Sequence, residues 1–89
     1  MQAKIFISGF VQGIGFRGFV KSHARKLGLK GWVQNVPDGR VEVLAQGEKS
    51  TIEKLIKLCE KGPFLSEVKS VQVDWEKEEE QFAGFETAH

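Results

Sequence analysis

A glycine-rich segment near the amino terminus carries the residues best suited to bind an anion. Residues 9–18 read Gly-Phe-Val-Gln-Gly-Ile-Gly-Phe-Arg-Gly. Glycines let the backbone turn tightly and point several N–H groups at one spot, and a following helix adds free amides and a positive dipole end. The planar guanidinium of Arg17 suits bidentate contact with phosphate oxygens. The residues alone favour an oxyanion site, with a glycine-rich turn beside a solvated arginine as the alternative.

The same segment also spells the dinucleotide-binding pattern G-x-G-x-x-G over residues 13–18, and Asp38 lies 20 residues further on. In dinucleotide-binding folds the acidic residue ends the second strand, whereas Asp38 lies inside the turn signal Pro37-Asp38-Gly39. A chain of 89 residues is also too short for the several parallel strands that such a fold needs. We therefore do not expect a dinucleotide site.

Other common catalytic and binding sets are not supported by the pattern. His23 and His89 have no cysteine or carboxylate at metal-ligand spacing, so we expect no metal site. Cys59 falls on the apolar face of a predicted helix, where a packing role is favoured over a nucleophilic one. The predicted strand over residues 40–46 lacks the aromatic side chains that stack on RNA bases, so we expect no nucleic-acid partner.

The elements that must position the glycine-rich segment begin on either side of it. Alternating apolar residues predict a strand over residues 3–8. Apolar residues at helical spacing from Phe16 to Leu27, closed by Gly28, predict a helix. A second strand is predicted over residues 31–35, and the turn signal at residues 36–39 joins it to a third strand over residues 40–46.

The rest of the chain completes a recognisable order of elements. A second helix is predicted to begin at a capping box, Ser50-Thr51-Ile52-Glu53, and to end at Gly62-Pro63. Alternation through Val71, Val73 and Trp75 predicts a fourth strand, and residues 82–87 could add a short last one. The order β-α-β-β-α-β predicts a ferredoxin-like, split βαβ fold of the α+β class. It has an antiparallel sheet with two helices on one face.

Composition sets the broad limits. The length predicts a single domain over residues 1–89, and one cysteine makes a reducing compartment, the cytoplasm, the simpler expectation. Neither a signal peptide nor a membrane span is expected. Residues 1–37 hold six basic and no acidic side chains, whereas residues 38–89 carry a net charge of −5. This asymmetry either attracts an anion to the first third of the chain or is merely solvated.

Two separated segments resemble the motifs of the acylphosphatase family. Residues 7–17, Ile-Ser-Gly-Phe-Val-Gln-Gly-Ile-Gly-Phe-Arg, are similar to its first motif. The second begins Gly31-Trp32-Val33-Gln34-Asn35 and continues, in the family's spacing, through Gly39-Arg40-Val41 to Gly47. The resemblance covers nearly the whole chain. The chain departs from many relatives at Phe10, where they carry a base, at Gly18, where they carry an aromatic, and in a loosely matching end.

The resemblance implies a function and a set of site residues. It implies hydrolysis of acyl phosphates to a carboxylate and inorganic phosphate, by a monomer that needs no cofactor and has no membrane partner. Arg17 would bind the phosphoryl group, and Asn35 would position the attacking water. The backbone amides that share the phosphate would be those of Phe10, Val11, Gln12, Gly13 and Ile14. The alternative is a non-catalytic anion-binding or accessory domain, since such domains also occur inside larger proteins that process carbamoyl phosphate.

Overall fold

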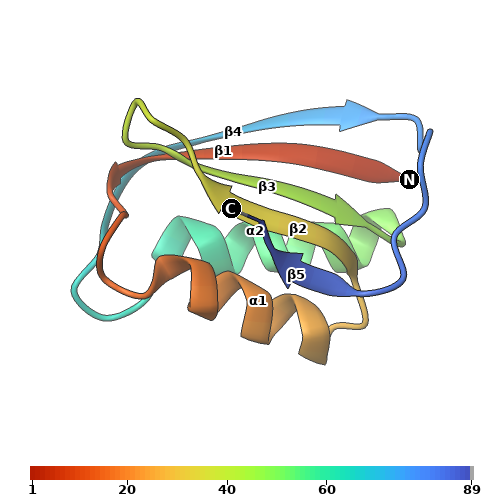
Figure 1. Ribbon diagram of the computed structural model, residues 1–89, viewed down its shortest axis with the longest axis horizontal. Helices are drawn as coiled ribbons and strands as arrows, with labels where there is room; N and C mark the ends of the chain where they lie inside the picture. Colours follow the sequence, from red (N-terminus) through yellow and green to blue (C-terminus); the bar gives the residue numbers. More distant parts are fainter. Residues whose placement is uncertain (89) are drawn as a thin grey trace.

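Two helices cover one face of a five-stranded sheet in the computed structural model, which describes residues 1–88 (Figure 1). The strands lie in the order β4-β1-β3-β2-β5. Every pairing in this sheet is antiparallel except that of β2 with β5. The strands are β1 Gln2–Phe10, β2 Lys30–Asn35, β3 Val41–Gln46, β4 Glu67–Glu76 and β5 Phe85–Thr87, and the helices are α1 Phe16–Lys26 and α2 Lys49–Lys61. This arrangement confirms the predicted ferredoxin-like α+β class.

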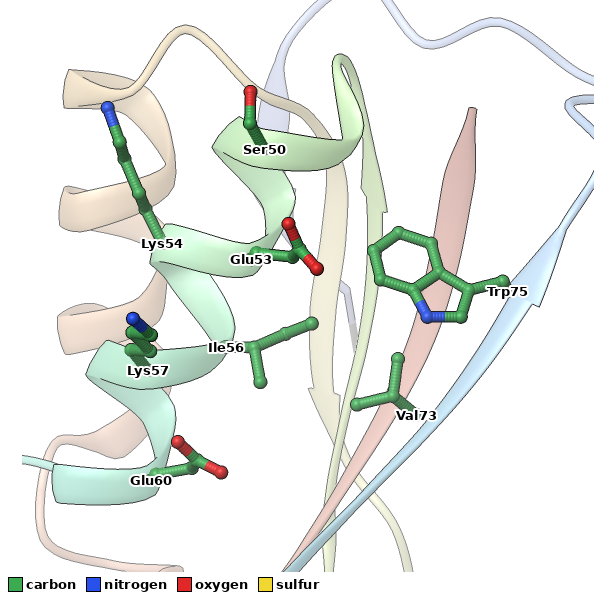
Figure 2. Close-up of a pocket in the computed structure, with 8 residues that line it drawn as sticks. All are labelled: Ser50, Glu53, Lys54, Ile56, Lys57, Glu60, Val73 and Trp75. Atoms are coloured by element: carbon green, nitrogen blue, oxygen red, sulfur yellow. The ribbon is translucent and has the colours of Figure 1, made fainter.

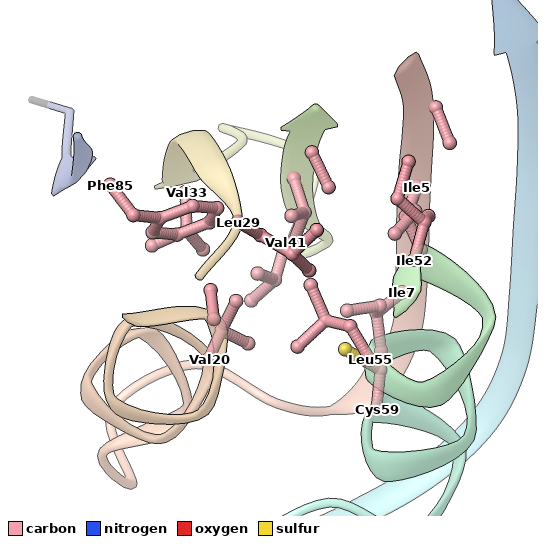
Figure 3. Close-up of a cluster of buried hydrophobic side chains, with 14 of the residues drawn as sticks. Ile5, Ile7, Val20, Leu29, Val33, Val41, Ile52, Leu55, Cys59 and Phe85 are labelled. Atoms are coloured by element: carbon pink, nitrogen blue, oxygen red, sulfur yellow. The ribbon is translucent and has the colours of Figure 1, made fainter. Parts of the chain in front are cut away.

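The register of the sheet decides which side chains face the helices. Ile7 on β1 lies opposite Val41 on β3 and Val71 on β4, and Val41 in turn lies opposite Asn35 on β2. Ile7 and Val41 are fully buried, so this row of residues faces the helices. Figure 3 shows side chains of the sheet meeting those of both helices in one apolar cluster. Burying a large apolar side chain contributes roughly 1.5–3 kcal/mol, so this cluster holds the two layers together.

Helix α1 begins where the glycine-rich segment ends. Gly15 caps it in the left-handed conformation (φ 84°), and its buried stripe consists of Phe16, Val20 and Ala24. Gly28, also at positive φ (74°), follows the carboxyl end and donates a backbone hydrogen bond to the carbonyl of Arg25 at 3.1 Å. The predicted apolar face and glycine stop are confirmed, with the helix ending one residue earlier than expected.

Helix α2 does not begin at the predicted capping box. Its N-cap is Glu48, which makes no side-chain capping bond, and Ser50 already lies inside the first turn. The carbonyl of Glu48 accepts hydrogen bonds from the amides of Thr51 and Ile52, both at 3.0 Å. Gly47 turns the chain sharply away from β3 (φ 156°), so the helix starts at the first residue after the turn. The predicted end at Gly62 is correct, because Gly62 caps the helix.

Residues 77–84 cross the end of the sheet and carry the chain from β4 to β5 (Figure 1). The buried Gln46 side chain holds this crossing: its amide nitrogen donates to the carbonyl of Glu80 and, at 3.0 Å, to Gln2 Oε1. Its amide oxygen accepts from the backbone N–H of Phe82 at 3.2 Å. Within the stretch that the structure describes, neither helix is long and apolar enough to cross a membrane.

Candidate active site

The phosphate-loop candidate, residues 11–15, joins β1 to α1 at one end of the molecule. The turn between β2 and β3 projects at the same end (Figure 1). The loop contains Gly13 and Gly15, both in the left-handed region (φ 77° and 84°), where other residues would be strained. Phe10 is the last residue of β1, lies opposite Glu67 on β4, and has a largely exposed side chain. The glycines are therefore needed for the sharp passage from strand to helix.

The backbone amides of the loop are free to bind a ligand. None of the N–H groups of Val11, Gln12, Gly13, Ile14 and Gly15 donates to another group of residues 1–88. The first hydrogen bond of α1 runs from the amide of Phe19 to the carbonyl of Gly15 at 3.0 Å. The N–H groups of the first turn therefore have no partner among residues 1–88, and they add the positive end of the helix dipole.

Arg17 lies in the first turn of α1, directly after the loop. Its side chain is half-buried, and its guanidinium forms no ion pair with any residue from 1 to 88. The first turn of α1 contains no acidic residue that would neutralise it. An uncommitted arginine beside free amides is an arrangement that can hold a phosphate group.

Asn35 ends strand β2 on the face of the sheet that the helices cover, two residues beyond the buried Val33. Strands β1 and β2 are both antiparallel to β3 and therefore run in the same direction. Asn35 thus lies at the same end of the sheet as the carboxyl-terminal end of β1, from which the loop leads to α1. The Asn35 Oδ1 atom is buried and has no hydrogen-bond partner among residues 1–88. A buried acceptor without a partner costs about 1–3 kcal/mol and is rare in folded proteins, so it calls for a bound group at this point.

A hydrogen-bonded link joins the loop to the end of β2. The Gln12 Nε2 atom donates to the carbonyl of Val36 at 2.8 Å and to the carbonyl of Arg40 at 2.9 Å. Val36 directly follows Asn35, so the loop is tied to the residue next to the candidate water-binding asparagine. Sequence reasoning assigned Gln12 a backbone role and missed this side-chain link. The signal available was a long amide side chain amid loop glycines, and nothing in the sequence indicates what it would reach.

The turn after Asn35 is held by local contacts. Asp38 accepts from the backbone N–H of Arg40 at 3.1 Å and from its Nε at 2.8 Å. These contacts with Arg40 lower the pKa of the Asp38 carboxyl. Gly39 takes a positive φ of 100°, as the turn signal predicted. Asp38 is thus a turn residue in the structure.

The remaining reactive side chains lie away from the loop. Cys59 lies on the buried face of α2, and burial raises the pKa of its thiol to about 12. His23 is half-buried and stacks edge-on against Phe19, with ring centroids 4.5 Å apart. No three His, Cys, Asp or Glu side chains of residues 1–88 are grouped to hold a metal ion. The other histidine of the sequence, His89, lies outside the described residues.

Two hollows on the surface share no residue with the loop, Arg17 or Asn35. A groove of about 580 Å³ lies between α2 and β4. Figure 2 shows Val73 and Trp75 on the strand side and α2 side chains, including Glu53 and Lys57, on the other. A smaller hollow of about 250 Å³ lies beside Gln46 and the crossing segment. Neither combines a free arginine with free amides, so the loop remains the candidate site.

Comparison with known proteins assigns the family. The family model described as acylphosphatase matches residues 3–87, a span that includes the loop, Arg17 and Asn35. The chain belongs to the acylphosphatase family. The resemblance of the two motifs is thereby confirmed over nearly the whole chain.

Individual acylphosphatases match over most of their length. One from Roseiflexus sp. (strain RS-1) is 44% identical over 84 residues, which cover 94% of this chain and 90% of that protein. The crystal structure of acylphosphatase from Bacillus subtilis superposes with a TM-score of 0.95 at 36% identity, covering 99% and 98% of the two chains. Relatives of this length and identity are enzymes, which places the chain among the acylphosphatase hydrolases.

The acylphosphatase fold also occurs as part of a longer protein. Full-length HypF, in a phosphate- and nucleotide-bound crystal structure, matches 99% of this chain with a TM-score of 0.87 at 32% identity. The matched part makes up 12% of the HypF chain. The fold therefore occurs both as a separate acylphosphatase and as a portion of a longer chain.

Proposed function

We propose that this acylphosphatase hydrolyses the carboxyl–phosphate bond of small acyl phosphates, with Arg17 and the loop amides holding the phosphoryl group and Asn35 positioning water. The observation that carries the proposal is the buried Oδ1 of Asn35, which has no hydrogen-bond partner among residues 1–88. Asn35 ends a strand whose following turn is tied to the phosphate loop by Gln12. Arg17 and Asn35 both lie within residues 3–87, the span that matches the family.

The loop and Arg17 supply the charge stabilisation. Phosphoryl transfer through a loose transition state spreads negative charge over three equatorial oxygens and asks mainly for positioning and electrostatic support. The amides of residues 10–14 and the guanidinium of Arg17 are donors of the right kind, and Arg17 has no carboxylate partner among residues 1–88. The donors are in place before the substrate arrives, so little reorganisation opposes the reaction.

Asn35 orients the nucleophile. A water molecule donates one hydrogen to Asn35 Oδ1, which satisfies the buried acceptor and turns an oxygen lone pair toward phosphorus. The water oxygen bonds to phosphorus as the bond from phosphorus to the bridging oxygen breaks. The carboxylate leaves with the bridging oxygen, and a phosphate oxygen takes the proton that the water loses. The products are a carboxylate and inorganic phosphate.

The leaving group explains why so few side chains suffice. A carboxylic acid has a pKa of about 4, so the carboxylate departs at neutral pH without a general acid. A phosphate oxygen serves as the proton acceptor, so no histidine or carboxylate base is needed either. The mechanism uses an arginine, backbone amides and one asparagine, and it draws on no cofactor or metal.

The second candidate is a non-catalytic anion-binding or accessory domain. The observation in its favour is the HypF structure, in which a closely similar fold forms a small part of a longer chain. The retention of both Arg17 and Asn35 favours the enzyme, because an anion site alone has no use for a water-positioning asparagine. We further propose that the enzyme acts as a monomer in the cytoplasm, consistent with its single buried cysteine.

Hydrolysis of benzoyl phosphate and acetyl phosphate in ¹⁸O-labelled water tests the proposal. Attack at phosphorus places the label in inorganic phosphate and none in the carboxylate, with one equivalent of each product. Label in the carboxylate would mean attack at carbon and would overturn the mechanism. A protein that binds phosphate but hydrolyses neither compound would support the accessory-domain alternative.

A further inference from the structure

Among residues 1–88, Gln12 is the one residue of the phosphate loop whose side chain forms a hydrogen bond to the turn that follows Asn35. Its half-buried amide reaches across from the loop to the turn between β2 and β3. The two acceptors, the carbonyls of Val36 and Arg40, are the ones that close this turn. The contact therefore connects the two halves of the proposed site.

Both hydrogens of the Gln12 side-chain amide are used, and both acceptors are then saturated. The carbonyl of Val36 also accepts from the amide of Gly39 at 3.0 Å, and the carbonyl of Arg40 accepts from the amide of Val36 at 2.8 Å. A carbonyl oxygen has two lone pairs, so each now has two donors. Gln12 thus completes a small network that fixes the position of the Val36 carbonyl.

The chemistry of the contact selects a carboxamide of this length. A glutamate would place an acceptor against two acceptors, an asparagine would be one methylene too short, and a methionine would fill the space without donating. A packing role alone would accept methionine, because its volume and flexibility are similar. The geometry therefore indicates that the pair of donors, rather than the bulk, is what the position needs.

We propose that the Gln12 side chain is a positioning residue that sets the distance between the phosphate loop and the water held by Asn35. The inference rests on the proposed function, because it assigns Gln12 a part in the same reaction. The Arg40 carbonyl that Gln12 binds also accepts from the N–H of Val36, and this N–H belongs to the peptide unit that joins Asn35 to Val36. The contact therefore holds the backbone from which the Asn35 side chain extends. Gln12 touches neither the phosphate nor the water through this side chain and acts through Asn35.

Gln12→Met is the test variant, and Gln34→Met is its matched control. Gln34 lies on β2 beside Asn35 but on the opposite face, where its Nε2 donates to Glu42 Oε1 at 2.8 Å. A misplacement of about 1 Å costs up to roughly 100-fold in rate, so we expect Gln12→Met to lower kcat by about 10- to 100-fold. The inhibition constant for inorganic phosphate should change less than about threefold, because Arg17 and the loop amides remain. The control should leave both unchanged.

A double-mutant cycle separates positioning from a general loss of structure. If Gln12 acts through Asn35, then Gln12→Met should cost little further kcat in a protein that already carries Asn35→Ala. A loss as large in that background as in the wild type would overturn the inference. So would a Gln12→Met enzyme with wild-type kcat.

Gln12→Glu gives an independent readout through pH. The ionised carboxylate repels both carbonyls, whereas the protonated acid can donate one hydrogen bond. The kcat of this variant relative to wild type should therefore rise as the pH falls through the titration of the introduced carboxyl group. A flat ratio would count against the donor role.

The side-chain amide resonances of Asn35 give a readout that needs no turnover. They should shift in Gln12→Met and stay in place in Gln34→Met, because only the first variant releases the Val36 carbonyl. Unchanged resonances in Gln12→Met would overturn the inference. This spectrum reports on the positioning role even if the wild type hydrolyses no acyl phosphate, a result that would remove the proposed function by itself.

Discussion

At the scale of single residues, Arg17 and Asn35 serve different parts of one proposed reaction. Arg17 supplies a fork of donors that matches phosphate oxygens. Asn35 supplies one acceptor, which is buried and unpaired among residues 1–88. Changing Arg17 should therefore affect both phosphate binding and turnover, whereas changing Asn35 should affect mainly turnover.

Arg17→Lys keeps the charge and loses the bidentate fork. We expect activity to fall at least about 100-fold, the scale of losing one donor to the transition state. The fold should survive, because Arg17 makes no ion pair with residues 1–88. Inorganic phosphate should raise the melting temperature of the wild type more than that of the variant. Near-normal turnover in Arg17→Lys would mean that the loop amides alone carry the phosphate.

Asn35→Ala removes the proposed water ligand. We expect kcat to fall by roughly 100-fold or more while the phosphate inhibition constant stays within a few-fold. The melting temperature should change little, because Asn35 Oδ1 has no hydrogen-bond partner among residues 1–88 that the substitution would remove. If Asn35 were only a turn residue, the variant would melt earlier and turn over normally. Melting temperature, inhibition constant and kcat on this one protein therefore distinguish the two roles.

At this scale the sequence indicated which residues could bind an anion. It did not indicate which contacts hold those residues together. Glycines around Arg17 are a local signal, and the roles of Arg17 and Asn35 came from resemblance to a family. The link from Gln12 to Val36 and Arg40 could not be predicted, because it joins segments 24 and 28 residues apart. Such a contact depends on the sheet that brings β1 beside β3 and β3 beside β2.

At the scale of elements, close approach between strands sets strict demands on single glycines. A Cβ atom at Gly31 would overlap the carbonyl oxygen of Leu44 on β3, and the backbone there has a positive φ of 134°. At Gly18 in α1, a Cβ atom would meet no atom within 4 Å. Replacing glycine by alanine should therefore lower the stability of the protein at position 31 and raise it at position 18.

Gly31→Ala should destabilise the protein by roughly 2–4 kcal/mol through backbone strain and steric overlap. Gly18→Ala should stabilise it by about 0.5 kcal/mol, because alanine favours the helix. Urea denaturation of both variants beside the wild type provides the measurement. Equal stability of the two variants would contradict the register of β2 against β3.

The helices and strands were mostly predictable from the sequence. The one wrong helix start, that of α2, has a local cause. The turn at residues 36–39 was correct because Asp38 and Gly39 fix it by contacts within the turn. The start of α2 was wrong because Ser50 and Glu53 match a capping box by type. The sharp exit from β3 at Gly47 instead lets the helix begin at Lys49. The position of the backbone turn at Gly47 therefore set the start of the helix, and the residue types at 50–53 do not report that position.

At the scale of the whole molecule, the distribution of charge supports a reaction that needs no metal. Residues 1–37, which include the loop and Arg17, hold six basic and no acidic side chains. Three of these basic side chains, Lys4, Lys21 and Arg25, form ion pairs with Glu42 or Glu86, whereas Arg17 forms none with residues 1–88. In the proposed mechanism, Arg17 and the loop amides provide the positive charge that a metal ion supplies in many other phosphoryl-transfer enzymes.

We expect hydrolysis of benzoyl phosphate to persist in excess EDTA, with kcat within about twofold of its value without chelator. Added magnesium should not raise it, because Arg17 and the loop amides already supply the charge stabilisation. The measurement is kcat before and after exhaustive chelation, followed by addition of each divalent metal. Activity that disappears with EDTA and returns with one metal would overturn the proposed mechanism.

The order of the strands also has a consequence for how the protein is made. Strand β1 leaves the ribosome before the other four, but β4, which covers its outer edge, begins only at Glu67. Strand β2, which carries Asn35, can pair along its outer edge only once β5, at Phe85–Thr87, has been synthesised. During synthesis both outer edges of the β1-β3-β2 core lie open, and open edges are where nascent chains pair wrongly with one another. Strands β4 and β5 thus cover the two edges of the three-stranded core that holds the proposed site.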